Sequence, residues 1–437
     1  MNRLATLIGM NRGNLYSVVN GSRQIKSEDF MNAVRLLSLA KNDADRLSDL
    51  YFSEYYGAEQ FNKIKFVIRE LSRFQAFQAP KDLSVEAFAG KTNLWNESQL
   101  LAALDHLIKN SESEIITNYP FESKQIDELF YANVYNKTIT GFIHIVSMKD
   151  SLSTLFSCLR FLFLQSFPYY TYEPLYSDCS VYPYFAVGDN GAVLFDNEKG
   201  LFVCDREAVA QIREKAQSFL EKCTQLGQLP GNIFEIKDYY AGINSFRTAS
   251  VFHRYPCITV YFYLEMFYAI ARPDLENREA MVHMAYEHYR SARANVDFSS
   301  FISLDGLNRF VETGNVAEIP KSMKVPLPKE EIVRCLENIR TAVENEKMYI
   351  WDSNKISMTE GLILENMSGN DIFVCGCRYD TSDFFEPDVF MAMLNDPSLN
   401  KVIADVGDYM IRAELVMNKK TVLACIDTHI ASLRNRE

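Results

Sequence analysis

Residues 4–23 read LATLIGMNRGNLYSVVNGSR, and this stretch decides how the start of the chain is expected to fold. Leu4, Leu7 and Ile8 recur at the spacing of one face of an amphipathic helix. Gly9 is expected to end that helix, because glycine adopts a left-handed backbone at little cost. The pattern therefore predicts a short helix that stops in a tight turn.

A second helix is predicted from Asn11 to Asn20. Asn11 is a suitable N-cap, and the Asn20-Gly21 pair is a typical helix stop. The buried face of this helix is expected to consist of Leu15, Val18 and Val19. Two helices joined by a tight turn form a helix-turn-helix, in which the second helix can enter the major groove of DNA.

Six residues, all but one of them with polar side chains, are left mostly on or near the outward face of the second helix. They are Arg12, Gly13, Asn14, Tyr16, Ser17 and Asn20. Asparagine can bond adenine edges, arginine can bond guanine edges or phosphate, and serine and tyrosine can reach phosphate oxygens. The glycine permits close approach to a backbone. Basic side chains expected to contact phosphates are Arg3, Arg23 and Lys26. These nine residues are the candidate DNA-binding residues.

The stretch resembles the phage-repressor (Cro-like, XRE-type) helix-turn-helix family of transcriptional regulators. The landmarks of that family are present as Ala5, Gly9, Leu15, Ser17, Gly21 and Arg23. The resemblance covers residues 1–57, and it implies that the helix from Asn11 to Asn20 is the recognition helix. Two further helices are expected, one capped by Ser27 and one by Asn42.

The family places another helix before this pair, so the first helix is missing from residues 1–57. One interpretation is that the natural protein starts farther upstream, and the other is that the domain is degenerate. Under the second interpretation the head would be a vestigial helical cap that serves only as a protein interface.

Charge is distributed unevenly along the 437 residues. The net charge is −12, yet residues 1–26 carry four basic side chains and no acidic one, which leaves −16 for residues 27–437. A basic head on an acidic body can touch phosphates locally, while the body suppresses loose binding elsewhere.

Several classes of protein are disfavoured by the sequence. The most apolar segments, 152–164 and 258–271, contain Arg160 and Glu265 and fall short of the roughly 18 apolar residues of a membrane span. The nine cysteines form no zinc or disulfide framework, and His283 and His288 are five apart, which does not suit one helix face. We expect a cytoplasmic protein without a metal or cofactor, and not an enzyme.

The rest of the chain alternates helices with strands. Residues 58–80 are expected to form a linker helix, residues 81–250 an α/β sensor or assembly module, and residues 251–437 a second α/β and helical module. In the first module, strands are expected at 184–187 and 192–195, separated by turn residues at 188–191. Among the elements expected in the second module is a helix at 388–394. The fold class is therefore α+β multidomain, with an N-terminal all-α helix-turn-helix and a mixed α/β region. Internal duplication is one interpretation of the element order, and it would make the two modules related.

The sequence thus predicts a bacterial DNA-binding transcriptional regulator. A homodimer would bind double-stranded DNA, and the C-terminal region would sense a small-molecule or peptide effector or hold the dimer together. The alternative is a sensory or protein-interaction scaffold whose vestigial helix-turn-helix does not bind DNA.

Overall fold

The computed structural model describes most of the chain in segments. The described residues are 2–73, 85–119, 124–135, 141–147, 152, 169–172, 182–196, 198–225, 248–256, 258–293, 299–316, 319, 323–356, 362–367, 371–377, 389–395 and 397–435. Within these ranges no helix is both long enough and apolar enough to cross a lipid bilayer.

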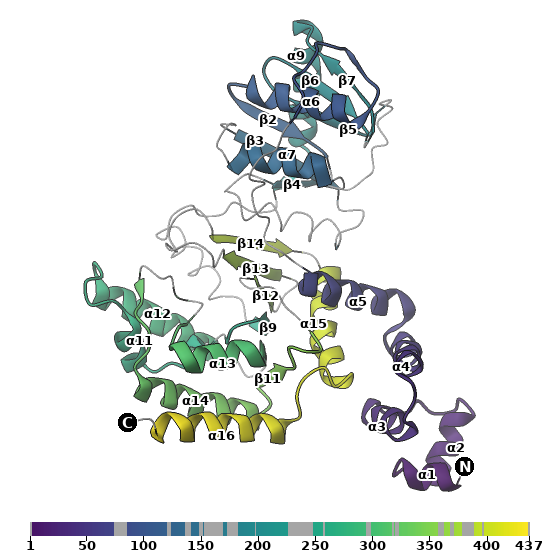
Figure 1. Cartoon of the computed structure of the whole chain (residues 1–437), viewed down its shortest axis with the longest axis vertical. Helices are drawn as coiled ribbons and strands as arrows, with labels where there is room; N and C mark the ends of the chain where they lie inside the picture. The colour runs from purple at the N-terminus through teal and green to yellow at the C-terminus, as the bar shows by residue number, and fades with distance from the viewer. Residues whose placement is uncertain are drawn as a thin grey trace.

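The N-terminal part of the chain is helical (Figure 1). Its elements are α1 (Asn2–Leu7), α2 (Arg12–Val19), α3 (Ser27–Leu37), α4 (Lys41–Tyr56) and α5 (Ala58–Arg73). Aromatic rings join α3 to α4, since Phe30 stacks on Tyr51 with ring centroids 4.0 Å apart. Phe52, which is fully buried, meets the edge of the Phe30 ring. We call these five helices, α1 to α5, the head, and they confirm the predicted all-α N-terminal region.

An eight-stranded mixed sheet follows, in the order β1-β7-β6-β5-β2-β3-β4-β8. Its described elements are β1 (Asn93–Leu94), α6 (Glu97–Lys109), β2 (Glu114–Thr117), α7 (Lys124–Tyr135), β3 (Gly141–Ser147), β4 (Tyr169–Tyr172), β5 (Tyr184–Val187), β6 (Ala192–Phe195), β7 (Gly200–Val203), α9 (Arg206–Leu220) and β8 (Thr224–Gln225).

A six-stranded sheet forms the second α/β unit, in the order β11-β10-β9-β12-β13-β14. Its described elements are β9 (Thr248–His253), η2 (Thr259–Tyr261), α11 (Leu264–Ile270), α12 (Arg278–Arg293), β10 (Ser299–Ser303), α13 (Leu304–Thr313), α14 (Lys329–Glu344), β11 (Met348–Trp351), β12 (Leu362–Met367), β13 (Asp371–Cys377), β14 (Val389–Asn395), α15 (Pro397–Arg412) and α16 (Lys419–Asn435).

Six consecutive strands of one sheet have the same order and direction as six strands of the other. β2, β3 and β4 are parallel neighbours, and β5 returns antiparallel beside β2 before β6 and β7 continue outward. In the second sheet, β9, β10 and β11 are likewise parallel neighbours. β12 pairs antiparallel with β9, β13 pairs antiparallel with β12, and β14 pairs antiparallel with β13. The α+β fold class is confirmed, and the shared topology fits two related modules.

One predicted helix is a strand. The segment expected to be helical at 388–394 is β14, which pairs with β13 along its whole length from Val389 to Asn395. Its Met, Ala and Leu residues are good helix formers, and this composition favoured the wrong element. Pairing with a neighbouring strand overrides such local propensity, because it satisfies the backbone groups of the entire segment.

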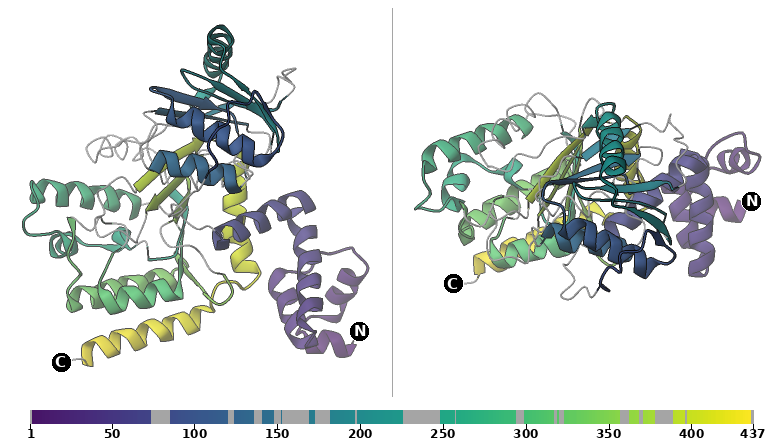
Figure 2. Two further views of the ribbon diagram at one scale, coloured as in Figure 1. Left: turned by 45° about the horizontal axis from the view of Figure 1, so that its top comes forward. Right: turned by 90° about the horizontal axis from the view of Figure 1, so that it is seen from above.

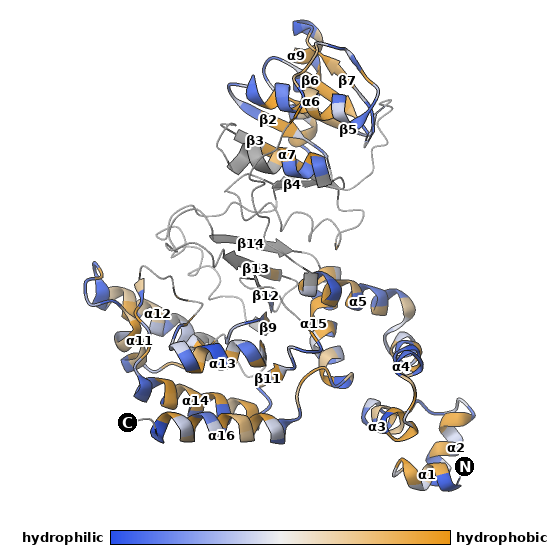
Figure 3. Cartoon of the chain, in the orientation of Figure 1, coloured by the Kyte–Doolittle hydropathy of each residue, from blue (hydrophilic) through white to orange (hydrophobic). Residues whose placement is uncertain are grey.

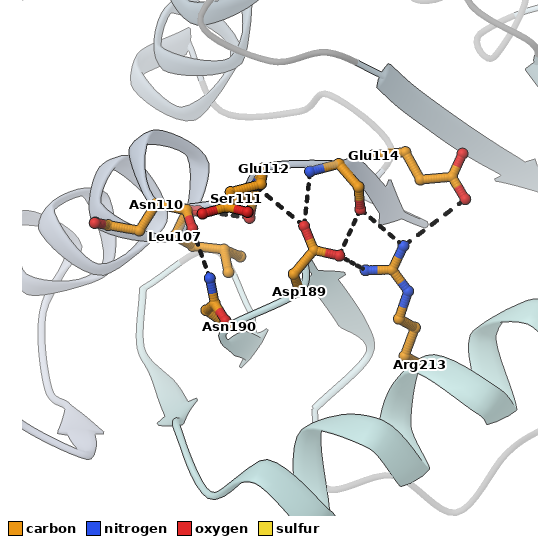
Figure 4. A network of polar contacts seen from close by, with 9 residues as sticks. Leu107, Asn110, Ser111, Glu112, Glu114, Asp189, Asn190 and Arg213 are labelled. Atoms are coloured by element: carbon orange, nitrogen blue, oxygen red, sulfur yellow. Dashed lines mark hydrogen bonds and ion pairs between the residues drawn. The ribbon is translucent and has the colours of Figure 1, made fainter.

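A polar network closes the turn between β5 and β6 of the first module (Figure 4). The Asp189 carboxylate accepts hydrogen bonds from the backbone nitrogens of Glu112 and Ser113, at 3.1 and 2.7 Å, and from Arg213 Nη1 at 2.6 Å. Burial opposes ionisation of Asp189, but the Ser113 hydrogen bonds and the Arg213 charge outweigh it and lower its pKa. The network ties α9 and the β5–β6 turn to the start of β2.

Candidate nucleic-acid interface

The α1–α2 pair is built around a small core. Ala5, Ile8 and Leu15 are buried together, with Met10 and Ala33 packed against them. Gly9 has a φ of +68° and lets the chain turn between the helices. The turn is closed by the Met10 backbone nitrogen, which donates to the Ala5 carbonyl at 2.9 Å. The short helix and tight turn expected from the sequence are confirmed.

The start of α2 is capped as its sequence predicts. Asn11 lies before the helix in an extended conformation, and its side-chain oxygen accepts from the Gly13 nitrogen at 2.8 Å. Asn20 is the C-cap, and Gly21 follows with a φ of +70°. The predicted helix bounds, Asn11 and Asn20, are therefore confirmed as the two caps.

Most of the nine candidate DNA-binding residues are accessible. Exposed are Arg3, Arg12, Gly13, Asn14, Tyr16, Asn20, Arg23 and Lys26, whereas Ser17 is half-buried. Ser17 Oγ donates to the Gly13 carbonyl at 3.1 Å, so its hydroxyl is already engaged within the helix. Arg3 lies on α1 and Lys26 directly precedes α3, so these two stand beside α2 rather than on it.

The structure brings two of the candidates into direct contact. Arg23 Nη1 donates a hydrogen bond of 2.7 Å to Asn14 Oδ1. The backbone nitrogens of Ser22 and Arg23 both donate to the Ser17 carbonyl, at 2.9 and 3.1 Å, and thereby fold the chain back after Gly21. From the sequence, Arg23 is expected to contact phosphate, and no pattern in the sequence links it to Asn14.

Two apolar predictions for this pair are wrong. Val19 was expected on the buried face of α2, but 61% of it is exposed, and Leu7, expected on the inner face of α1, is 55% exposed. The core beneath them is small, since α3 supplies only Ala33 and a hydrogen bond from Asn32 Nδ2 to the Ile8 carbonyl at 3.3 Å. Hydropathy colouring shows both apolar and polar stretches along α1 and α2 (Figure 3).

The head is fastened to the last third of the chain through α15. Tyr56 at the end of α4 donates to Asp408 Oδ2 at 2.7 Å, and Gln60 on α5 donates to Asp405 Oδ2 at 2.7 Å. The ring of Tyr409 packs edge-on against Phe52 and Phe61, with centroids 4.9 and 5.6 Å away. We call this set of contacts the α15 contact. It comprises Tyr56, Gln60, Phe52 and Phe61 of the head and Asp405, Asp408 and Tyr409 of α15.

Charged side chains extend the α15 contact toward α3. Arg412 Nε donates to both carboxylate oxygens of Asp408, at 2.8 and 2.7 Å, and its guanidinium lies 4.9 Å from the ring centroid of Tyr55. Arg35 on α3 pairs with Glu414 at 3.0 Å. Both partners of this last pair are largely exposed, so it contributes little to stability.

Burial perturbs the tyrosines of the α15 contact. Burial, followed by the hydrogen bond to Asp408, raises the pKa of Tyr56. Burial also raises the pKa of Tyr409 to about 12. Each phenol is therefore held in its neutral form, in which its hydroxyl can donate a hydrogen bond.

The opposite face of α15 lies on the second sheet. Val402, Ile403 and Val406 are buried in the core that contains Phe252 and Phe301. Gly407 allows α15 to lie close to the second sheet, because a Cβ at this position would be only 3.0 Å from the Phe301 ring. Two views place α15 beside the β12–β13 strands on one side and α5 on the other (Figures 1 and 2). The helix thus connects the second sheet to the head.

Residues 58–80, expected to form a linker helix, begin with α5. Its apolar side chains Ile64, Val67 and Leu71 are buried in the same core as Val402 and Ile403 of α15. The sequence indicates only the sheet side of this helix, because apolar residues of 399–410 recur at helical spacing. Asp405 and Asp408 fall between them and read as solvent-facing, so the pattern does not predict the contact with the head.

In the segments that the structure describes, no three His, Cys, Asp or Glu side chains cluster as a metal site would require. Described cysteines in the free thiol form are Cys204, Cys223, Cys335 and Cys425.

No protein-family model and no curated protein matches the chain. Solved structures with similar segments include the archaeal chromatin protein TrmBL2 (TM-score 0.22, covering 42% of this chain and 69% of that one). Others are phosphatidylserine synthase from Haemophilus influenzae (TM-score 0.23, covering 85% and 98%) and polyphosphate kinase from Porphyromonas gingivalis (0.22, covering 72% and 45%). Each is 10% identical to the chain, and similarity at this level carries no argument about function.

Proposed function

We propose that the chain is a sequence-specific DNA-binding transcriptional regulator. The observation that carries the proposal is α2, a helix capped by Asn11 and seated on a buried Leu15, with Arg12, Asn14 and Tyr16 exposed. These side chains offer the donors and acceptors that base edges and phosphates need.

Charge supports the same function. Arg3, Arg12, Arg23 and Lys26 lie within the first 26 residues and are all exposed. The acidic remainder of the chain repels a second stretch of DNA and restricts binding to the head.

We further propose a homodimer and an effector-binding C-terminal region. Two heads related by a twofold axis would place their α2 helices about one helical turn of DNA apart, roughly 34–36 Å. Because α15 contacts both the second sheet and the head, an effector that shifts the sheet against α15 would change the spacing of the two heads.

A non-DNA-binding interaction scaffold is the second candidate. The observation that favours it is the exposure of apolar side chains on the head, with Leu7, Val19 and Leu50 each more than half exposed. Where such side chains join into a contiguous apolar patch, they form a surface to which another protein binds.

The deciding experiment is fluorescence anisotropy of the whole chain with DNA fragments flanking its own gene, across a salt series. Arg12→Ala and Asn14→Ala should each weaken binding to the preferred fragment by about 1–3 kcal/mol. Arg3→Ala and Lys26→Ala should each lower the salt slope by about one unit without changing fragment preference.

Matched controls are Arg46→Ala and Asn42→Ala, which make the same substitutions at exposed positions of α4. Asn42 was expected to cap this helix, but it lies inside α4, whose N-cap is Ala40, so its replacement removes no cap. Neither control should alter fragment preference. Weak binding that is equal for all fragments, and equal for the wild type and the Arg12/Asn14 variants, would contradict the regulator and favour the scaffold.

A further inference from the structure

We infer that Arg23 is a positioning residue that orients Asn14 for base recognition, and that it does not act as a phosphate anchor. The inference rests on the DNA-binding function proposed above. It starts from the 2.7 Å hydrogen bond between Arg23 Nη1 and Asn14 Oδ1, which joins the segment after α2 to the first turn of that helix.

The backbone around Gly21 directs Arg23 back along α2. Gly21 adopts a φ of +70°, which few other residues tolerate. Beyond it, the Ser17 carbonyl accepts from the nitrogens of Ser22 and Arg23 and from Ser22 Oγ, at 2.9, 3.1 and 3.0 Å. Three donors on one carbonyl fix the turn, so the guanidinium reaches Asn14 from a defined direction.

The chemistry of this contact fixes the orientation of the Asn14 amide. A guanidinium only donates hydrogen bonds, so the atom that faces it is the amide oxygen. The amide nitrogen lies on the other branch of the side chain and keeps its two donors. An asparagine held in one orientation also loses less side-chain entropy when it binds DNA.

A consequence for base preference follows. Bidentate reading of adenine by asparagine requires the amide oxygen to accept from the adenine N6 amino group while the nitrogen donates to N7. In this chain Arg23 already occupies one of the two lone pairs of that oxygen, so the donors of the amide nitrogen are the groups that Asn14 offers first to a base. The bases that offer acceptors in the major groove without a neighbouring donor are guanine, through O6 and N7, and thymine, through O4. Asn14 is therefore assigned to a guanine or a thymine.

The test selects binding sites for the whole chain from DNA duplexes with a randomised central segment. The site position whose preference disappears in Asn14→Ala identifies the base that Asn14 reads, and that base should be guanine or thymine. Arg23→Ala should reduce selectivity at this same position by about fivefold to a hundredfold and shift it toward adenine. In the Asn14→Ala background, Arg23→Ala should cause no further loss of selectivity.

A salt series on the selected site separates the two roles of Arg23. A phosphate anchor lost in Arg23→Ala would lower the salt slope by about one unit and weaken all sequences equally, as Arg3→Ala is expected to do. A positioning residue leaves the slope unchanged. Arg23→Lys sharpens the distinction, because lysine keeps the charge but lacks the planar guanidinium. Selectivity at the Asn14-dependent position should therefore fall, while the salt slope should stay unchanged.

Three outcomes overturn the inference in distinguishable ways. An adenine at the Asn14-dependent position contradicts the assignment of Asn14 to a guanine or a thymine. A reduced salt slope in Arg23→Ala with intact selectivity assigns Arg23 to a phosphate and leaves the proposed function standing. If the wild type itself selects no sequence, the proposed function fails, and the inference fails with it. Thermal melting of each variant verifies that the head is folded in every comparison.

Discussion

Tyr56 donates a hydrogen bond of 2.7 Å to Asp408, although 352 residues separate the two in the sequence. The same carboxylate receives Arg412, so Asp408 is held from both the head and its own helix. The DNA-binding candidate is therefore not tethered by a loose linker, because side chains of α4 and α5 fasten it to a helix of the second module.

Tyr56→Phe tests how much this hydrogen bond contributes. The substitution keeps the ring and removes the hydroxyl, while Asp408 keeps its pairing with Arg412. We expect the free energy of unfolding to fall by about 1 kcal/mol, measured by urea titration. Tyr16→Phe, on the exposed face of α2, is the matched control and should be neutral. Equal stability of the two variants would show that the Tyr56–Asp408 hydrogen bond does not stabilise the folded protein.

Alkaline pH should lower the free energy of unfolding through two partly buried tyrosines. The pKa of Tyr51 and of Tyr409 is raised from 10.0 to about 12, in each case mainly by burial. A raised folded-state pKa gives stability that is complete below pH 10 and is lost as the pH rises toward 12. The loss should approach about 1.4 kcal/mol per pH unit for Tyr409 and be smaller for Tyr51, which is less buried and more screened by solvent. Denaturation midpoints should fall across this window and fall less steeply in Tyr409→Phe.

Acid should weaken the protein through two buried histidines. Burial lowers the pKa of His144 and of His253 from 6.5 to about 3. A depressed folded-state pKa gives stability that is complete above pH 6.5 and is lost as the pH falls toward 3. His253 is fully buried, and neither ring nitrogen has a hydrogen-bond partner in the described structure. His253→Leu should therefore fold and show a flatter loss of stability between pH 6.5 and 4; an unchanged slope would argue against a neutral buried imidazole.

Gly188→Ala should destabilise the first module. A Cβ at this position would lie 2.0 Å from Ser111 Oγ and 3.1 Å from Ser111 Cβ. Overpacking of this kind costs about 1–3 kcal/mol, which thermal unfolding would detect. Ser111→Ala removes the nearer atom, so the double variant should lose less than the sum of the two single variants. Additive losses would mean that the clash is relieved elsewhere.

Local signals in the sequence predicted the short-range features well. The strands at 184–187 and 192–195 were predicted with the bounds that the structure has, because turn residues at 188–191 separate them. The caps of α2 were also predicted, since Asn11 and Gly21 act on neighbouring backbone groups. Each of these features depends on residues that are close in the sequence.

The features that the sequence did not reveal depend on distant partners. β10 begins with Ser299 and Ser300, which do not stand out as a strand, and it is formed by pairing with β9 and β11 on either side. Leu7 and Val19 have apolar spacing, but whether they are covered depends on what packs against them. Likewise, Asp405 and Asp408 read as solvent-facing acids until the head is placed beside them.

The position of α15 in the chain has a consequence for biosynthesis. The head is translated well before the helix that fastens it, because α4 ends at Tyr56 and α15 begins only at Pro397. Until then the rings of Phe52 and Phe61 lack their Tyr409 partner and the Tyr56 hydroxyl lacks its carboxylate. A polypeptide terminated before α15 would carry the candidate recognition helix without its attachment, so only copies that include α15 present a head fixed to the second module.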